Sequence, residues 1–143
     1  MTNFLGLLCD LDGTLADTEP QHCAAWLEML AEVHQLNYDI HWFDQWIGTS
    51  DRAVAAWLID EHQLSVSVDT LIEAKQIRFH ALVRTSGKGF SGVSEQLATI
   101  SARFPLAIAT NSGRKDAAVV VPALGLDRFT DTIVGSSTHL TPP

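Results

Sequence analysis

The sequence is poor in cysteine and in positive charge, and its apolar runs are short. It holds two cysteines, nine Lys and Arg, and 17 Asp and Glu, for a formal net charge of -8 over 143 residues. Two cysteines provide no disulfide framework and suit a reducing compartment. The acidic balance disfavours nucleic acid and anionic membranes as partners, and no apolar run approaches the length of a membrane span. With no basic amino-terminal segment either, we expect a cytoplasmic protein that binds neither nucleic acid nor a membrane.

The patterns that are present predict an α/β fold. An apolar run at Phe4–Cys9 suits a strand buried on both faces. After residue 86, helical patterns alternate with strands at 105–110 and 131–135, which predicts a parallel sheet with right-handed crossovers. We expect an α/β core of about three strands from residues 1–16 and 86–143.

Residues 17–85 predict a separate helical unit inserted after the first strand. Helical spacing runs from Thr18 to Leu36, then a short aromatic segment ends at Gly48, and two further helices follow. Ser50 or Asp51 can cap the first of these two helices. All four tryptophans lie in this stretch, at Trp26, Trp42, Trp46 and Trp57. Their concentration predicts a small core of its own, and we expect them to be core residues more than sugar platforms.

Two aspartates follow the first predicted strand, in the segment FLGLLCDLDGTLADTEP. Asp10 and Asp12 are two apart, so in an extended chain their side chains point to the same side, at the carboxyl end of the strand. Open α/β sheets bind ligands at that edge. Two neighbouring carboxylates repel unless a cation lies between them or one holds a proton. The pair therefore predicts a Mg2+ site, because Mg2+ prefers oxygen ligands and bridges carboxylates to phosphate.

The same pair suits phosphoryl transfer. An ionised aspartate can attack phosphorus, and a protonated one can give its proton to the leaving alkoxide. Gly13 permits a sharp turn, and Thr14 supplies a hydroxyl and a nearby amide for a phosphoryl group. The alternative is an ordinary turn with turn-forming aspartates, since Asp-Gly alone is a common turn signal.

CDLDGTLADTEP resembles the first motif of the haloacid dehalogenase superfamily, in the branch with a helical cap after that motif. LAIATNS, residues 106–112, resembles the second motif, a strand that ends in a Ser or Thr. Within the superfamily, DTEPQHCAAW looks most like the β-phosphoglucomutase and sugar-phosphate phosphatase group. The resemblance implies a Rossmann-like sheet with an inserted helical cap, Mg2+ as cofactor and a small phosphorylated substrate.

The resemblance also implies roles for single residues. Asp10 would be the nucleophile and a metal ligand, and Asp12 the general acid and base with its carbonyl on the metal. Thr110 and the Asn111 amide would hold phosphoryl oxygens. Thr110 also precedes a predicted helix near Gly113, and the free amides of a helix N-terminus bind anions. Alternatively, Thr110 only caps that helix.

Two residues of the predicted cap are further candidates. His22 resembles a group that assists proton transfer at the hinge, or else it is an exposed or capping histidine. Arg52 could hold a second anionic or hydroxyl-rich part of the substrate, or it is a solvated helix residue. Lys75 and Arg78 have the same alternatives.

Two motifs of the resembling family do not follow the strand at 131–135. These are a Lys that neutralises the aspartyl-phosphate and acidic residues that complete the Mg2+ shell, whereas the sequence continues with SSTHLTPP. We therefore expect a truncated gene product, a piece of a longer protein or the product of a damaged gene. The first strand would then be an exposed apolar edge, a surface for self-association.

Three functions follow from these observations. The first is a Mg2+-dependent phosphohydrolase of a small phosphorylated metabolite, most simply a sugar phosphate, acting through an aspartyl-phosphate on Asp10. The second is a β-phosphoglucomutase-like transfer with the same residues, and the third is a non-catalytic module that binds phosphate or a partner. A phosphorylated receiver domain fits poorly, because it lacks a long insert after its first strand.

Overall fold

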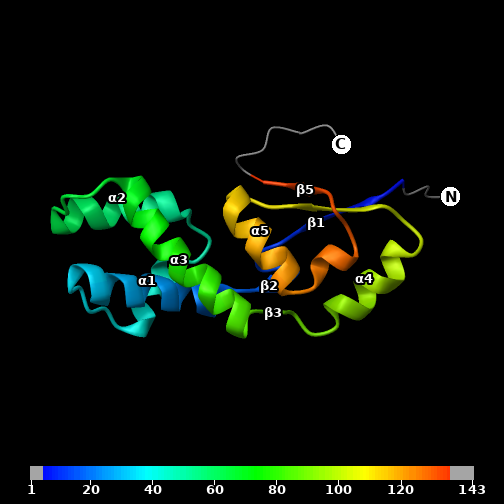
Figure 1. Cartoon of the computed structure of the whole chain (residues 1–143), viewed down its shortest axis with the longest axis horizontal. Helices are drawn as coiled ribbons and strands as arrows, with labels where there is room; N and C mark the ends of the chain where they lie inside the picture. Colours follow the sequence, from blue (N-terminus) through cyan, green and yellow to red (C-terminus); the bar gives the residue numbers. More distant parts are fainter. Residues whose placement is uncertain (1–4, 136–143) are drawn as a thin grey trace. The chain divides into compact units, whose positions relative to one another are not determined.

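The computed structural model describes residues 5–135, which form two compact units. Residues 5–18 and 83–135 form the α/β unit, and Glu19–Leu82 form the helical unit (Figure 1). The predicted α/β class with a parallel sheet and an inserted set of helices is confirmed. That the units are separate domains with boundaries near residues 16 and 86 stays a prediction. In the part of the chain that is described, no helix combines the length and apolarity that crossing a bilayer requires.

The sheet of the α/β unit has three parallel strands in the order β1-β4-β5 (Figure 1). They are β1 (Leu7–Asp10), β4 (Leu106–Ala109) and β5 (Ile133–Val134). The register pairs Asp10 with Ala109, so β1 and β4 end at the same level. Asp10, Asp12 and the residues from Thr110 onward therefore lie at the same edge of the sheet. Phe4, the predicted start of the first strand, lies outside the described residues.

The prediction that the first strand is buried on both faces is wrong. The exposed fractions of Leu7 and Leu8 are 38% and 66%, whereas Leu106 and Ile108 of β4 are buried. Within residues 5–135, β1 has a neighbour on one side only and forms the edge of the sheet. The expected exposed apolar edge is thus present, and self-association through it stays a prediction.

A second, two-stranded sheet was not predicted. β2 (Ala16–Asp17) pairs antiparallel with β3 (Lys88–Gly89). A strand of two residues is too short to show the alternation of apolar and polar side chains by which strands are predicted from sequence. Both strands belong to the α/β unit, one shortly before residue 19 and the other shortly after residue 82.

Two helices and a short turn of 3-10 helix complete the α/β unit. They are α4 (Val93–Ser101), α5 (Arg114–Ala123) and η2 (Leu126–Arg128). Pro122 occupies the last turn of α5, which ends one residue later. α5 buries Ala117, Val120 and Val121.

The helical unit contains the four elements that the sequence predicts: α1 (Glu19–His34), η1 (Ile40–Trp46), α2 (Asp51–His62) and α3 (Val68–Ser86). Ser50 is the N-cap of α2, and its hydroxyl accepts a hydrogen bond from the Ala53 amide. The core consists of Trp26, Met29, Leu30, Phe43, Val54, Ala55, Leu58 and Leu71, with the other three tryptophans packed against it. The tryptophans are therefore core residues, as expected.

Candidate active site

A tight turn after β1 positions Asp10 and Asp12. Between them, Leu11 is fully buried and anchors the turn. Its carbonyl oxygen accepts hydrogen bonds from three amides, those of Thr14 (3.3 Å), Leu15 (2.9 Å) and Ala16 (2.9 Å). The turn thus closes on the end of β1 and keeps both acidic residues beside the edge of the sheet.

Gly13 and Thr14 serve this turn through their backbone. Gly13 has φ +76, and a Cβ at this position would meet no atom within 4 Å, so the need for glycine is conformational. The Gly13 amide donates to the Ala16 carbonyl at 3.0 Å, and the Thr14 amide donates to the Leu11 carbonyl. A phosphoryl oxygen would have to share these amides, and the binding role of both residues stays a prediction.

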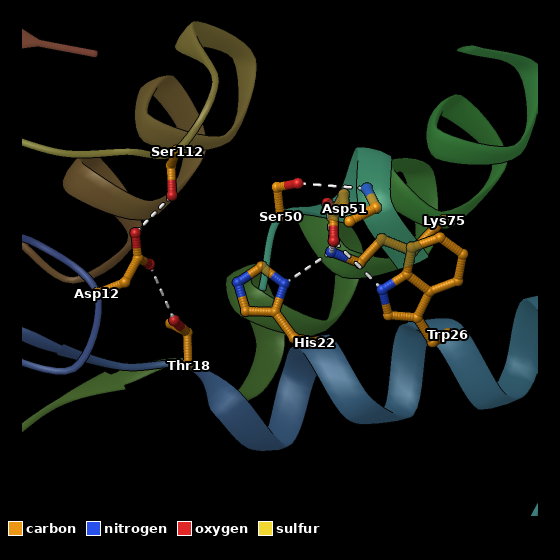
Figure 2. A network of polar contacts seen from close by, with 9 residues as sticks. Asp12, Thr18, His22, Trp26, Ser50, Asp51, Lys75 and Ser112 are labelled. Atoms are coloured by element: carbon orange, nitrogen blue, oxygen red, sulfur yellow. Dashed lines mark hydrogen bonds and ion pairs between the residues drawn. The ribbon is translucent and has the colours of Figure 1, made fainter. Parts of the chain in front are cut away.

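The Asp12 carboxylate accepts hydrogen bonds from three hydroxyls, and Figure 2 shows two of them, those of Thr18 and Ser112. Thr110 and Ser112 donate to Oδ2, the former at 3.0 Å, and Thr18 donates to Oδ1 at 3.4 Å. The contact between Asp12 and Thr110 joins residues 98 positions apart. The structure therefore brings the two motifs together, as their positions at the ends of β1 and β4 predict.

Ser112 is a site residue that the sequence reasoning missed. Its hydroxyl contacts Asp12, and its amide donates to the Thr110 hydroxyl at 3.0 Å. The available signal was its place between the end of a strand and the start of a helix, two residues after Thr110. Asn111 between them is exposed. Gly113 is the N-cap of α5 and has no side chain to occupy the first amides of the helix.

The Asp10 side chain is exposed, and one of its two carboxylate oxygens accepts a hydrogen bond from the described residues. Its Oδ1 accepts a hydrogen bond from the Leu11 amide at 2.9 Å, and Oδ2 accepts none from residues 5–135. Burial raises the pKa of the neighbouring Cys9 thiol. Since the thiolate is the reactive form of cysteine, this raised pKa disfavours Cys9 as a nucleophile at neutral pH.

The two carboxylates fit Mg2+ by their chemistry. Mg2+ prefers oxygen donors and is usually bound by one or two carboxylates together with phosphate and water. Asp10 and Asp12 supply such donors at the end of β1. Within residues 5–135, no group of three or more His, Cys, Asp and Glu converges on one point. The donor set therefore supports a metal shared with a phosphate more than a site made of protein ligands alone.

His22 belongs to a polar cluster of the helical unit (Figure 2). Its Nδ1 lies 2.7 Å from Lys75 Nζ, and its ring stacks on Phe79 with centroids 3.9 Å apart. Lys75 is fully buried and donates to both oxygens of Asp51, at 3.0 and 2.9 Å. Asp51 also accepts a hydrogen bond from the Trp26 indole at 3.2 Å. The proton-transfer role expected for His22 stays a prediction.

Arg52 lies on the surface of the helical unit. Its guanidinium pairs with Asp69 at 2.6 Å, and the exposed fractions of the two side chains are 66% and 74%. This environment matches the alternative of a solvated helix residue, and contact with a substrate stays a prediction.

Comparisons with known proteins agree on a family. The family model described as haloacid dehalogenase-like hydrolase matches residues 7–143. The sequence is similar to the fructose-1-phosphate phosphatase YqaB of Escherichia coli (strain K12), with 29% identity over 133 residues, 93% of this chain and 70% of that protein.

Solved structures show the same fold. CbbY from Rhodobacter sphaeroides in complex with phosphate has a TM-score of 0.80 at 23% identity, over 97% of this chain and 66% of that one. A HAD family hydrolase from Deinococcus radiodurans R1 with bound phosphate and sodium has a TM-score of 0.62 at 26% identity, over 94% and 58%. The chain thus spans about two thirds of the length of these relatives.

Proposed function

Because the chain belongs to the haloacid dehalogenase-like hydrolase family, we propose that it is a Mg2+-dependent phosphohydrolase that acts through an aspartyl-phosphate on Asp10. The substrate would be a small phosphorylated metabolite, and a sugar phosphate is the proposed class because YqaB is named for fructose 1-phosphate. The observation that carries the proposal is the contact of Asp12 with Thr110 and Ser112, beside Asp10. It unites a carboxylate pair with hydroxyl donors at one sheet edge.

The proposed reaction has two steps. Asp10 Oδ2 attacks phosphorus in line with the leaving oxygen, a P–O bond forms to Asp10, and the bond to the substrate alkoxide breaks. Asp12 gives its proton to that alkoxide. Asp12 then takes a proton from water, which attacks the aspartyl-phosphate and releases phosphate and free Asp10.

The other residues of the site would bind and orient the phosphoryl group. Thr110 and Ser112 hold the Asp12 carboxylate in the resting structure, and their hydroxyls could turn to phosphoryl oxygens once substrate enters. The Asp10 carboxylate and the Asp12 backbone carbonyl would hold Mg2+, which would supply positive charge against the phosphoryl oxygens. A cytoplasmic location stays a prediction.

A non-catalytic phosphate-binding module is the second candidate. The absence of a third convergent carboxylate in residues 5–135 favours it for this chain taken alone. A mutase reaction would use the same groups and return the phosphoryl group to another hydroxyl, and no contact in the described residues favours it.

Metal removal tests the proposal. We expect release of phosphate from para-nitrophenyl phosphate in the presence of Mg2+. We expect this activity to be lost when EDTA removes the metal, because no cation would then stabilise the negative charge on the phosphoryl oxygens in the transition state. Phosphate binding without turnover would support the non-catalytic module instead. Neither binding nor turnover would contradict both candidates.

The Thr110 hydroxyl gives a sharper test of the site. Thr110→Val keeps the side-chain shape but removes the donor, so we expect kcat/KM to fall by about 10- to 100-fold, because a hydrogen bond to a charged group contributes about 1.5–3 kcal/mol. Thr110→Ser keeps a hydroxyl and is expected to retain most of the activity. Equal losses in both variants would show that packing at residue 110, and not its hydroxyl, matters.

A further inference from the structure

A group of aromatic rings lies at the surface of the helical unit. The centroids of neighbouring rings are 4.4 to 6.4 Å apart. Each of these side chains is half-buried, so part of it stays accessible to a partner. Ile40, which begins η1 among them, has an exposed fraction of 63%. We call this group the aromatic surface, and its members are Tyr38, Trp42, Trp46, Trp57 and His62.

The aromatic surface is bordered by negative charge. Asp60 and Glu61 are exposed and follow Trp57 by three and four residues on α2, the spacing that places side chains on one side of a helix. Burial and then the charge of Glu61 raise the pKa of Tyr38, so this carboxylate acts on the surface directly. The only Lys or Arg in residues 27–74 is Arg52, which pairs with Asp69 at 2.6 Å. A cation at the aromatic surface would therefore find carboxylates without a lysine or arginine nearby in the sequence.

Two buried hydrogen-bond donors of this surface are unsatisfied. The indole N–H groups of Trp42 and Trp46 are buried and donate to no acceptor in residues 5–135. Buried donors are normally paired, and an unpaired one costs free energy. By contrast, the indole of Trp26, in the core of the same unit, donates to Asp51 at 3.2 Å. The aromatic surface thus differs from the core in leaving polar atoms without partners.

We propose that the aromatic surface is a docking site for an arginine-rich segment of a partner protein. Planar guanidinium groups would stack on the rings of Tyr38 and Trp57 and pair with Asp60 and Glu61. Small rotations of Trp42 and Trp46 would direct their indole N–H groups to backbone carbonyls of the docked segment. Trp, Tyr and Arg are the residues that contribute most to binding at protein interfaces. The site lies wholly within residues 19–82 and does not depend on the proposed phosphoryl transfer.

The test follows the four indole N–H signals of the protein by NMR while a peptide of six arginines is added. At about 0.15 M salt, where charges more than about 8 Å apart are screened, we expect the signals of Trp42, Trp46 and Trp57 to shift. The signal of Trp26 should stay in place, because its side chain is fully buried and already paired with Asp51.

Two further peptides separate charge from shape. A peptide of six citrullines keeps the planar group but lacks the charge, and a peptide of six lysines keeps the charge but lacks the plane. We expect the arginine peptide to bind at least about tenfold more tightly than the citrulline peptide and about two- to fivefold more tightly than the lysine peptide.

Two variants each remove one negative charge from the helical unit. Glu61→Gln should weaken binding of the arginine peptide about two- to fivefold, the range for an exposed ion pair. Asp69→Asn is the matched control, because its partner Arg52 lies about 12 Å along α2 from Asp60. It should change the affinity by less than about 1.5-fold at the same salt concentration.

Several outcomes would overturn the proposal. A shift of Trp26 as large as those of the other tryptophans, or equal losses in Glu61→Gln and Asp69→Asn, would show unspecific attraction to an acidic protein. Equal binding of the citrulline peptide would assign the surface to an uncharged partner. Shifts of the same signals with protein concentration alone would assign it to a second copy of this chain.

Discussion

Asp10→Asn is expected to lower kcat for aryl phosphate hydrolysis by at least about a thousandfold, because an amide cannot attack phosphorus. The fold should be unaffected. Asp10 is exposed, and the hydrogen bond that its side chain accepts from the Leu11 amide can be accepted equally by the carbonyl oxygen of Asn. The measurement is steady-state phosphate release at saturating Mg2+, together with a thermal unfolding curve to show that stability is retained.

Asp131→Asn is the matched control, since Asp131 is an exposed aspartate before β5 whose side chain accepts a hydrogen bond from the adjacent Thr132 hydroxyl. It should keep full activity. A covalent readout adds to the test, because a hydroxylamine-sensitive phosphoryl adduct should form on the unsubstituted protein and be absent from Asp10→Asn. Retained turnover in Asp10→Asn would show that another group attacks phosphorus.

Asp51→Ala is expected to destabilise the helical unit by about 3 kcal/mol. The substitution leaves the Lys75 ammonium fully buried without its carboxylate, and broken buried ion pairs cost about 3–5 kcal/mol. We take the lower end because the Asp51 side chain keeps an exposed fraction of 23%. Urea unfolding followed by tryptophan fluorescence measures the loss, since all four tryptophans lie in residues 19–82.

Asp69→Ala is the control for this prediction. It breaks the exposed pair with Arg52 and should cost less than about 1 kcal/mol. The double substitution Asp51→Leu with Lys75→Met should recover part of the lost stability, because apolar side chains can replace a buried pair. Equal effects of Asp51→Ala and Asp69→Ala would show that burial of the Lys75 pair carries no special cost.

Local patterns predict most elements of this fold correctly. α1, α2 and α3 follow from apolar spacing and from Ser50 as a cap. β4 follows from the apolar run before Thr110, and α5 follows from the helical pattern after Gly113. The candidate site follows for a similar reason. Parallel strands end at a common edge, so residues after β1 and β4 meet wherever the strands are neighbours. The common edge of neighbouring parallel strands is therefore enough to predict that Asp12 and Thr110 lie close together.

Other features depend on neighbours far away in the chain. The exposure of β1 depends on how many strands flank it, because a strand buried on both faces and an edge strand share one apolar pattern. The contact of Lys75 with Asp51 and His22 joins residues 24 and 53 positions apart. Single residues carry too little signal to predict such contacts.

The linear order of amino acids thus decided the class of fold, the acidic pair and the edge of the sheet where it lies, because periodicity and turn chemistry act over a few residues. Folding in three dimensions decided the rest. It added Ser112 to the site, exposed Leu8 and buried the charge of Lys75 against Asp51. Burial and pairing are properties of a side chain's surroundings, and those surroundings are assembled from segments that the chain itself keeps apart.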